Sequence, residues 1–417
     1  MKIYLVGIKG TGLSALAGIL QDDGLEVLGA DVPQWLFTED DLKRRNILIE
    51  DIDHIHLPPD AFVVLGHSFC NHPIVEVLHR EGIPYLEYHQ FLFFYFQNRR
   101  QIAVAGTHGK TTTVGMIGDA FYPICMLRGD GTGRGGASPS VVFEACEYQD
   151  HFLAYFPEEA VITNIGYDHV DYFKSKKQYH DSFQEFAMHA GKLYIRYGDR
   201  KKILHPNMVT FGIRKGDYHY RHVHYDEQGF SGDLYFHETK LLSIQLPIFG
   251  KYQAEHVLVT FAIAHQREMN LDTIYQNLAK RKGIKRRITT TLVNDDVLID
   301  DYAHHPHEID ATISIVEQMY PNRKVVVVFK PDRLSRLYGF RSAFQKALNH
   351  ADSAYVLPSY EIDSKFSFSS FWNSPSIHPL HSVEELLEER EKGKTVYLFV
   401  SSKDMSSWEN ELKSKIQ

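Results

Sequence analysis

Cysteine and tryptophan are scarce in this sequence, with three of each among 417 residues. Cys70, Cys125 and Cys146 stand far apart in the chain and lack the short spacings that are typical of zinc-binding motifs. So few cysteines exclude a small disulfide-linked scaffold and favour a reducing compartment. We therefore expect a cytoplasmic location.

Long apolar runs and an excess of positive charge are also absent. No stretch approaches the roughly 18 apolar residues that would indicate a membrane-spanning helix, and the apolar start of the chain meets glycine too early for a signal peptide. The formal net charge is -8, so no overall basic field would attract nucleic acid or anionic lipid. We expect neither membrane insertion nor a nucleic-acid partner, and the sequence leaves the oligomeric state open.

The chain does contain a regular alternation of strand-like and helical patterns, which predicts an α/β fold with parallel sheets. A polar hinge at 97–100 and a basic segment at 281–287 interrupt this alternation. They divide the chain into three units, and we predict three domains. Their expected bounds are 1–98, 99–283 and 284–417.

Strand-like runs mark the first and third units. They are short, apolar and rich in β-branched residues: 3–7, 26–30 and 62–66, then 297–303, 324–330, 353–358 and 395–402. In the second unit, residues 204–248 alternate in polarity and carry turn residues, so we expect antiparallel strands there. A helix is expected from about 251 to 268.

The segment QIAVAGTHGKTTT (101–113) predicts a phosphate-binding loop. An apolar strand ends at Gly106, a tight loop passes through Gly109, and Lys110 and Thr111 begin a helix. Glycines let backbone N–H groups approach phosphate oxygens, and a helix N-terminus favours negative charge. Lys110 can reach the terminal phosphates and the Thr111 hydroxyl can bind Mg²⁺. The alternative is a glycine-rich turn that binds nothing.

A second glycine-rich turn lies near the N-terminus. Gly7, Gly10, Thr11 and Gly12 follow a strand and open a helix, and Asp31 ends the next strand-like run, where an acidic residue would meet a ribose or a base. A purely structural turn is an equally good interpretation of this pattern. A nucleotide bound here would be a second one, because the lysine-bearing loop already serves the first.

Glu144 and His169 each follow a predicted strand of the second unit. Ligands bind at the carboxyl ends of parallel strands, and a carboxylate with an imidazole there could hold a divalent ion that bridges phosphates. Spacing alone favours the alternative, a role in capping or in a polar network.

The third unit carries the acid- and histidine-rich segment 298–308 (LIDDYAHHPHE) at a strand end. Arg333 and Arg336 follow another apolar run. Paired guanidinium groups suit a carboxylate or a phosphate, because each can form two parallel hydrogen bonds. Each segment taken alone could also be a solvated loop.

Several motifs together carry a resemblance to a known family. They are GIKGTGLSALA (7–17), GAD (29–31), GTHGKTTT (106–113), GDGTGRG (129–135), FEACEYQDHFLAYFPEEAVITNIGYDHVDYF (143–173), GIKRR (283–287), DDYAHHPHEI (300–309) and FKPDRLSR (329–336). With these motifs in this order, the sequence resembles the Mur ligases, the ATP-dependent amide ligases that build the peptidoglycan stem peptide. The resemblance implies a Rossmann-like N-terminal domain for a UDP-linked substrate, a central P-loop ATP-binding α/β domain and a Rossmann-like C-terminal domain.

The resemblance also implies roles for individual residues. The expected catalytic residues are Lys110, His304, Arg333 and Arg336. ATP is expected to contact Gly106, Thr107, His108, Gly109, Lys110, Thr111, Thr112, Asn164, Gln253, Arg287, Asp301 and Tyr302. The UDP-linked substrate is expected at Gly7, Gly10, Thr11, Gly12 and Asp31. Mg²⁺ is expected at Thr111, Glu144 and His169.

Some motifs depart from the family pattern. The adenine-side motif, usually close to G-x-H-N-x-x-N, here has Tyr252, Gln253 and His256. The usual Gln-Pro-His of the third domain is Lys330-Pro331-Asp332, and the expected glycine-rich turn near the C-terminus is VSSKD (400–404). The departures fall in adenine recognition and in the amino-acid half of the site.

The implied reaction joins an amino acid, expected to be L-alanine, to a UDP-linked muramic acid. ATP would activate the carboxylate as an acyl phosphate. Two alternatives stay open: a divergent ligase with another acceptor, and a non-catalytic nucleotide-binding relative that regulates wall synthesis. A nicotinamide dehydrogenase is disfavoured by the lysine-bearing loop. On the loop pattern alone, Lys110→Ala should abolish turnover and leave thermal unfolding nearly unchanged.

Overall fold

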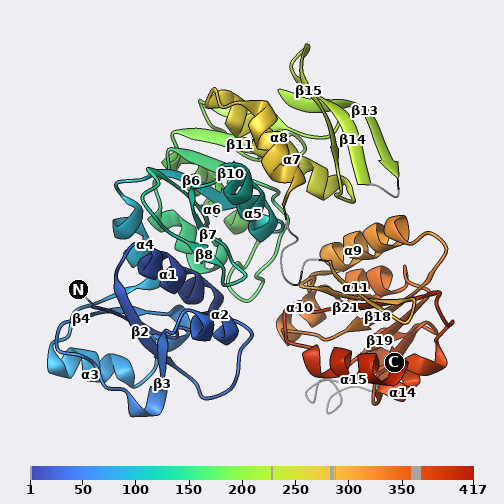
Figure 1. Ribbon diagram of the computed structural model, residues 1–417, viewed down its shortest axis with the longest axis horizontal. Coiled ribbons are helices and arrows are strands. Elements are labelled where there is room, and N and C mark those ends of the chain that lie inside the picture. Colours follow the sequence, from blue (N-terminus) through green and yellow to red (C-terminus); the bar gives the residue numbers. More distant parts are fainter. Residues whose placement is uncertain (1, 227–228, 282–285, 287, 358–367) are drawn as a thin grey trace.

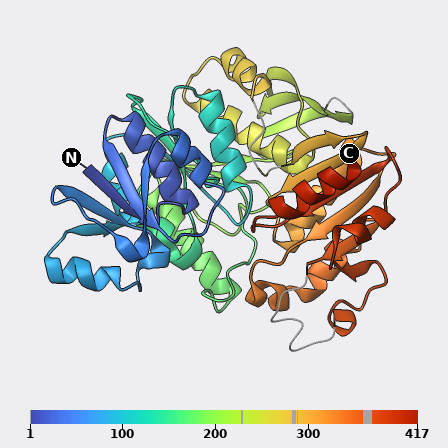
Figure 2. The same ribbon diagram turned by 60° about the horizontal axis from the view of Figure 1, so that its bottom comes forward.

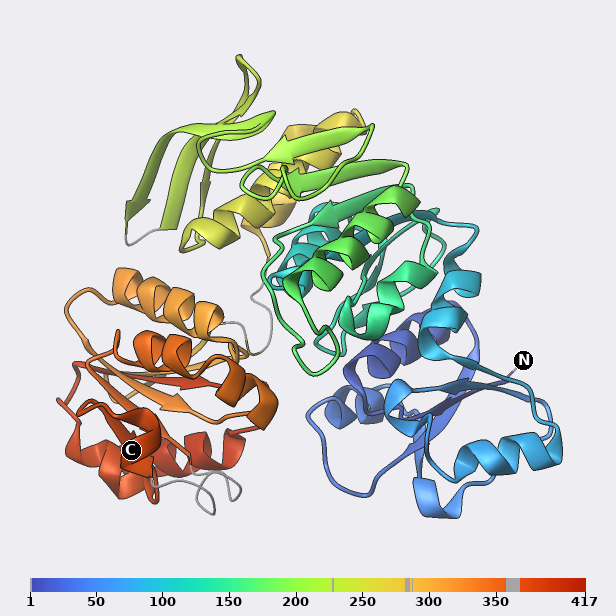
Figure 3. The ribbon, with the colours of Figure 1, turned by 180° about the vertical axis from the view of Figure 1, so that it is seen from behind.

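The computed structural model describes residues 2–226, 229–281, 286, 288–357 and 368–417. Three α/β bodies, each built on its own sheet, form an arch (Figure 1). The central body stands at the top of this view and joins the N-terminal body, in blue, to the C-terminal body, in orange and red. The view from behind shows the same arrangement (Figure 3).

The N-terminal sheet has five parallel strands in the order β3-β2-β1-β4-β5. Its strands are β1 (Lys2–Val6), β2 (Glu26–Asp31), β3 (Leu48–Asp51), β4 (Ala61–Leu65) and β5 (Tyr85–Glu87). Its helices are α1 (Thr11–Asp22), α2 (Glu39–Arg44), α3 (Ile74–Glu81) and α4 (Tyr88–Phe96). The strand order reverses on either side of β1, so the glycine-rich turn after β1 lies at a switch point, where open α/β sheets bind ligands.

The central sheet has ten strands in the order β15-β14-β13-β12-β11-β10-β6-β9-β7-β8. They are β6 (Arg100–Ala105), β7 (Cys125–Leu127), β8 (Gly133–Arg134), β9 (Ser140–Glu144), β10 (Glu159–Ile162), β11 (Lys192–Arg196), β12 (Met208–Phe211), β13 (Tyr218–Asp226), β14 (Gly229–Phe236) and β15 (Thr239–Leu246). The helices are α5 (Lys110–Ala120), η3 (Tyr148–Ala154), α6 (Lys176–His189), α7 (Lys251–Gln266) and α8 (Leu271–Ala279).

The expected antiparallel strands are confirmed for β13, β14 and β15. The expectation is wrong for β12, which lies within 204–248 but pairs in parallel with β11. The run MVTF continues the parallel sheet, and polarity alternates only from β13 onward, where one face of the ribbon is exposed. The helix expected from about 251 to 268 is α7.

The C-terminal sheet has the order β16-β17-β21-β18-β19-β20, with β17 to β20 and β21 parallel and β16 antiparallel to β17. Its strands are β16 (Thr289–Val293), β17 (Asp296–Asp301), β18 (Lys324–Phe329), β19 (Ser353–Val356), β20 (Ile377–Pro379) and β21 (Thr395–Val400). Its helices are α9 (Pro306–Met319), α10 (Leu334–Gly339), α11 (Arg341–Leu348), α13 (Phe368–Trp372), α14 (Val383–Glu388) and α15 (Ser406–Ile416). The edge strand β16 is not anticipated by the apolar pattern, because its three threonines are exposed.

The first two bodies share a hydrophobic core, whereas the third has its own. Leu16 and Leu20 of α1 belong to the same buried cluster as Cys125 and Leu127 of β7. Glycine at 133 allows this close docking, because a Cβ there would lie 1.7 Å from the carbonyl oxygen of Ala15. The C-terminal sheet packs around separate clusters, so the contacts named below between it and the central body are largely polar. Figure 2 shows the three bodies side by side.

The predicted boundary at 283/284 lies outside the described residues, and the predicted domain bounds stay predictions.

Candidate functional site between the central and C-terminal domains

The segment predicted to bind phosphate forms a strand–loop–helix turn at the carboxyl end of β6. Gly106 and Gly109 have φ angles of 135° and 82°, which glycine adopts without strain. A Cβ at Gly106 would lie 2.1 Å from the Thr163 hydroxyl. Lys110 is the first residue of α5, so the N-terminal N–H groups of this helix are available to an anion.

Hydrogen bonds to the segment that follows the neighbouring strand β10 brace this loop. The amide of Asn164 accepts from the backbone N–H of His108 at 3.2 Å and donates to its carbonyl oxygen at 2.8 Å. The Thr107 hydroxyl donates to the Gly166 carbonyl oxygen at 2.6 Å and accepts from the Gly166 N–H at 2.8 Å. Both Thr107 and Asn164 were expected to contact ATP; in the structure they fix the shape of the loop.

Lys110 forms an ion pair that the sequence analysis missed. Its ammonium group donates to Glu147 Oε2 at 2.9 Å and to the Gly106 carbonyl oxygen at 2.5 Å, and Glu147 is 0% exposed. Burial alone would raise the pKa of Glu147, but Lys110 and His169 lower it to about 2. Burial alone would lower the pKa of Lys110, yet the carboxylate of Glu147 holds it above its usual range. Both groups are therefore charged.

The expected Mg²⁺ ligands follow three neighbouring strands. Thr111 follows β6, Glu144 ends β9 and His169 follows β10, and these strands are adjacent in the order β10-β6-β9. Glu144 accepts a hydrogen bond from the Gly129 N–H at 2.6 Å. His169 Nε2 lies 3.6 Å from Glu147 Oε1. His169 has a φ of 51°, which is an uncommon conformation for a non-glycine residue.

The two arginines after β18 reach across to the central domain. Arg336 Nη2 lies 3.2 Å from Asp168 Oδ2, and its Nη1 lies 2.7 Å from Asp332 Oδ2. Arg336 and Asp168 are buried, and Asp332 is partly buried. Arg333 lies 3.7 Å from Asp171 and 5.1 Å from the centre of the Tyr148 ring. The predicted substrate-facing role of both arginines stays a prediction, and the structure adds a second role in holding the two domains together.

Histidines form another bridge between the same domains. His108 Nδ1 of the phosphate loop lies 3.0 Å from Glu308 Oε1 of α9. His305 accepts from the backbone at the N-terminus of α9 and is 2% exposed; burial and the nearby His108 lower its pKa to about 3. His304, expected to be catalytic, has Nδ1 2.9 Å from the Tyr302 carbonyl oxygen.

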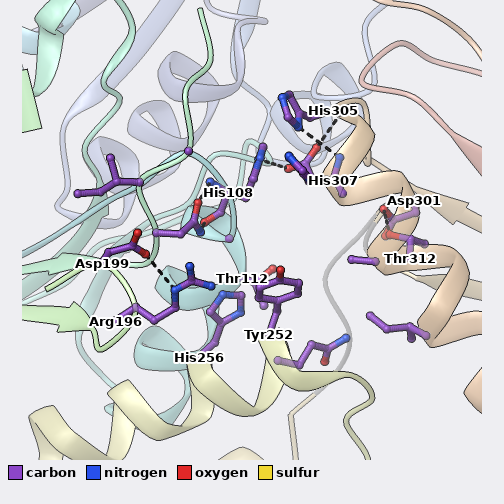
Figure 4. A pocket seen from close by; sticks show the side chains of 18 of the residues that line it. His108, Thr112, Arg196, Asp199, Tyr252, His256, Asp301, His305, His307 and Thr312 are labelled. Atoms are coloured by element: carbon purple, nitrogen blue, oxygen red, sulfur yellow. Dashed lines mark hydrogen bonds and ion pairs between the residues drawn. The ribbon is translucent and has the colours of Figure 1, made fainter. Parts of the chain in front are cut away.

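A cavity of about 350 Å³ lies beside the phosphate loop, between the central domain and α9 (Figure 4). The expected ATP contacts that line it are His108, Gly109, Thr112, Asn164, Gln253 and Asp301. Its wall also includes residues that were not anticipated: Arg196, Asp199, Lys202, His305, His307, Thr312 and Ile315. Arg196 Nε donates to Asp199 Oδ2 at 3.0 Å.

The altered adenine-side motif lies at this cavity. Tyr252, Gln253 and His256 of α7 all line it. A Cβ at Gly109 would lie 2.4 Å from His256 Nε2, so the imidazole that replaces the usual amide packs directly on the phosphate loop. Asp301 accepts from the N–H groups of Ala303 and Ile288.

Two further expected ATP contacts are Tyr302 and Arg287. The Tyr302 ring lies 5.3 Å from the guanidinium carbon of Arg286 and is not part of the cavity wall. Arg287 lies outside the described residues. The predicted roles of both stay predictions.

The N-terminal glycine turn is tightly packed. Gly7 has a φ of 87°, and a Cβ there would lie 2.8 Å from the Phe69 ring. A Cβ at Gly12 would lie 2.8 Å from the Tyr88 hydroxyl. Asp31 accepts from the Lys9 N–H at 2.7 Å and is 4% exposed, and burial raises its pKa. Gly10 precedes α1 and Thr11 begins it. Asp31 therefore shapes the turn, and its expected contact with the UDP-linked substrate stays a prediction.

One signal could have found Glu147. Glu147 lies three residues after Glu144 at the end of a predicted strand. A second carboxylate at a site for negatively charged phosphate predicts a nearby cation, because buried charges are paired. The interdomain partners Asp168 and Glu308 carry no such signal, because only the folded chain brings them to Arg336 and His108.

The comparisons with known proteins identify an ATP-dependent ligase of three α/β domains, and the predicted phosphate-binding loop lies where the second domain meets the third. The chain belongs to the Mur ligase family. The model of the "Mur ligase family, catalytic domain" matches residues 2–99, the "Mur ligase middle domain" matches 136–264, and the "Mur ligase, glutamate ligase domain" matches 286–402.

Curated relatives cover most of the chain. The UDP-N-acetylmuramate–L-alanine ligase of Limosilactobacillus reuteri is 37% identical over 85% of this chain and 84% of its own length. That of Lactococcus lactis subsp. cremoris is 33% identical over 97% and 96%.

Solved structures agree on the fold. The UDP-N-acetylmuramate–alanine ligase of Thermotoga maritima superposes with a TM-score of 0.85 at 23% identity, covering 100% of this chain and 99% of that one. The murein peptide ligase of Psychrobacter arcticus gives a TM-score of 0.71 at 20% identity, covering 100% and 98%. Within the described part of the chain, no helix is long and apolar enough to cross a membrane.

Proposed function

We propose that this chain joins L-alanine to UDP-N-acetylmuramate in peptidoglycan precursor synthesis. ATP would phosphorylate the muramate carboxylate, and the amine of L-alanine would then displace phosphate from the acyl carbon. The curated relatives at 33–37% identity carry this activity in their names, which supports the assignment. ATP and UDP-linked sugars are cytoplasmic metabolites, so we also propose that the enzyme acts in the cytoplasm.

The single observation that carries the proposal is the charged Lys110 at the phosphate loop. Its ammonium group is held by Glu147 at 2.9 Å at the N-terminus of α5. A positive charge fixed in this way is positioned to stabilise a phosphoryl group during transfer without reorganisation. His108 and Asn164 hold the adjacent loop, which fixes the position of the phosphate site.

The donor set suits a divalent ion. Thr111 and Glu144 offer oxygen atoms, which Mg²⁺ prefers, and His169 Nδ1 is buried with no hydrogen-bond partner. We propose that Thr111, Glu144 and His169 hold Mg²⁺, which would neutralise phosphate charge when bound. The C-terminal domain would exclude water from the site through its contacts at Asp168 and His108.

A coupled assay for phosphate release tests the proposal. Purified protein with ATP, Mg²⁺ and UDP-N-acetylmuramate should release phosphate when L-alanine is added. Lys110→Met should abolish this release, whereas Lys177→Met should retain it, because Lys177 is an exposed lysine paired with Asp181 on α6. Folded protein that releases no phosphate dependent on L-alanine would refute the proposal.

A second candidate is a Mur-type ligase with a different acceptor. Asp332 stands where the family usually has histidine, and it takes up one nitrogen of Arg336 that an acceptor carboxylate could otherwise use. A screen of amino acids in the same assay separates the two candidates. Nucleotide binding by calorimetry without any product would instead indicate the non-catalytic alternative.

A further inference from the structure

A second group of ligating side chains lies in the N-terminal domain, away from the phosphate loop. His67 and Cys70 follow β4, and Glu87 ends β5. One ligand atom from each lies within 4.8 Å of the other two, and no other group of this kind occurs in the part of the chain that the structure describes. Since β4 and β5 are adjacent and parallel, the three residues lie at the carboxyl edge of the sheet, where such folds bind ligands.

The hydrogen bonds within this group involve a thiol, which is a weak donor and a weak acceptor. Cys70 Sγ lies 4.0 Å from both His67 Nδ1 and the Gly66 carbonyl oxygen, which are long contacts for a weak donor. Burial and the neighbouring Glu87 raise the pKa of the Cys70 thiol to about 11. Glu87 accepts a weak hydrogen bond from this thiol, which favours its protonated form when no metal is bound.

Two more histidines surround the group. His89 Nδ1 lies 3.7 Å from Glu87 Oε2. The ring of His151, on η3 of the central domain, lies 4.7 Å from that of His67 and 4.8 Å from that of His89. Burial and these neighbouring rings lower the pKa of His151 to about 4, so a neutral imidazole faces the group.

We propose that His67, Cys70 and Glu87 form a binding site for a divalent metal ion of the class that prefers nitrogen and sulfur, such as Zn²⁺. Imidazole nitrogen, thiolate sulfur and carboxylate oxygen are ordinary zinc ligands, with bonds of roughly 2.0–2.3 Å. Donors around one tetrahedral ion are then about 3.5 Å apart. The three ligand atoms lie within 4.8 Å of one another, so binding an ion would require them to approach by about 1 Å.

The surroundings complete the case for a metal site. His89 can orient the Glu87 carboxylate, as outer hydrogen-bond partners of metal ligands commonly do. His67 is exposed and the other two are half-buried, so an ion can enter, and three protein ligands leave a fourth position open. The thiol selects against Mg²⁺, which prefers oxygen. This site is therefore different in chemistry from the one proposed at Thr111, Glu144 and His169, and it does not depend on the proposed function.

Cobalt substitution tests the site, because Co²⁺ bound to a thiolate gives a charge-transfer band in the near ultraviolet. Full-length reduced protein is stripped with a chelator and titrated with Co²⁺ in excess Mg²⁺, which occupies oxygen-rich sites. We expect a band that saturates at one equivalent and is abolished by Zn²⁺, the stronger binder of the two. Absence of a saturable band in the parent protein overturns the proposal.

Variants locate the thiolate. Cys70→Ser should lose the band, whereas Cys146→Ser should keep it, and thermal unfolding shows that each is folded. Loss of a residue that only hydrogen-bonds to a metal ligand weakens metal binding about 10–100-fold, and loss of the ligand His67 in His67→Ala should weaken Co²⁺ binding by at least as much. This variant tests the site if Cys70→Ser does not fold. A band that persists in Cys70→Ser, disappears in Cys146→Ser, or keeps full affinity in His67→Ala would each refute the site.

Discussion

Replacing Lys110 by Met should destabilise the central domain as well as abolish turnover. Lys110 is the cationic partner of Glu147, which is 0% exposed. The loop pattern alone predicts a purely functional residue with little effect on unfolding. The buried carboxylate changes that expectation, because removal of one partner leaves a charge in the interior.

The expected loss of folding free energy can be worked out from the protonation of Glu147, which is the least costly way to neutralise this carboxylate. Without Lys110 the carboxyl can take up a proton, and at pH 7 this lies 2.5 pH units above its usual pKa of 4.5. At about 1.36 kcal/mol per unit, protonation costs about 3.4 kcal/mol. For a domain of this size each kcal/mol lowers the midpoint by about 2–4 °C, so the domain should melt about 7–14 °C lower.

The direction in which stability changes with pH follows from the pKa of Glu147 in each protein. In Lys110→Met the folded-state pKa of Glu147 is raised above the unfolded value, so folding takes up a proton and stability falls as pH rises above 4.5. The deficit against the parent should shrink to about 0.7 kcal/mol at pH 5. In the parent, the pKa of Glu147 is lowered to about 2, so its contribution is present above 4.5 and is lost as pH falls toward 2.

Calorimetry of nucleotide-free, metal-free protein between pH 5 and 8 measures these differences, with phosphate release measured in parallel. The matched control is Lys110→Met combined with Glu147→Gln, which should recover most of the stability at pH 7 and none of the turnover. The reasoning fails if Lys110→Met melts with the parent at pH 7, or if the double variant is as unstable as the single one.

Three other changes test the site. Arg336→Lys keeps the charge but breaks the bidentate hydrogen bonding to Asp168. Loss of about 1.5–3 kcal/mol of charged hydrogen bonding should lower kcat/KM about 10–100-fold and increase the size of the ligand-free protein measured by X-ray scattering. A raised KM with unchanged scattering would instead indicate a direct substrate contact. Gly109→Ala places a Cβ 2.4 Å from His256 Nε2, so nucleotide binding by calorimetry should be lost while the fold is kept; unchanged affinity would contradict the packing. His305→Asn keeps a helix N-cap but cannot titrate. Since the pKa of His305 is lowered to about 3, the parent should lose stability as pH falls from 6.5 toward 3, and the variant should lose less; equal slopes in urea titrations would exclude His305 as the cause.

Local sequence pattern predicted the elements that carry the phosphate site. The strand that ends at Gly106, the helix that begins at Lys110 and the positive φ of both loop glycines follow from short-range chemistry. The parallel strands were predictable for the same reason, because they are buried on both faces and read as apolar runs. The edge strand β16 was not, because its exposed threonines need no apolar pattern to pair with β17.

Tertiary partners could not be predicted in this way. Asp168 and Arg336 are far apart in the sequence, and nothing local to either reports their bidentate contact. The proposed metal site shows the same limit. The cysteines lack metal spacing among themselves. His67 is three residues from Cys70, but only the pairing of the adjacent parallel strands β4 and β5 brings Glu87 to both.

The described ion pairs link the phosphate loop to the position of the C-terminal domain. Lys110 contacts Glu147, Glu147 lies next to His169, and Asp168, the neighbour of His169 in the chain, holds Arg336. A phosphate group that binds at Lys110 places negative charge beside this chain of ion pairs. Because the third domain has its own core and meets the second through such polar pairs, its closure can respond to nucleotide charge without repacking either core.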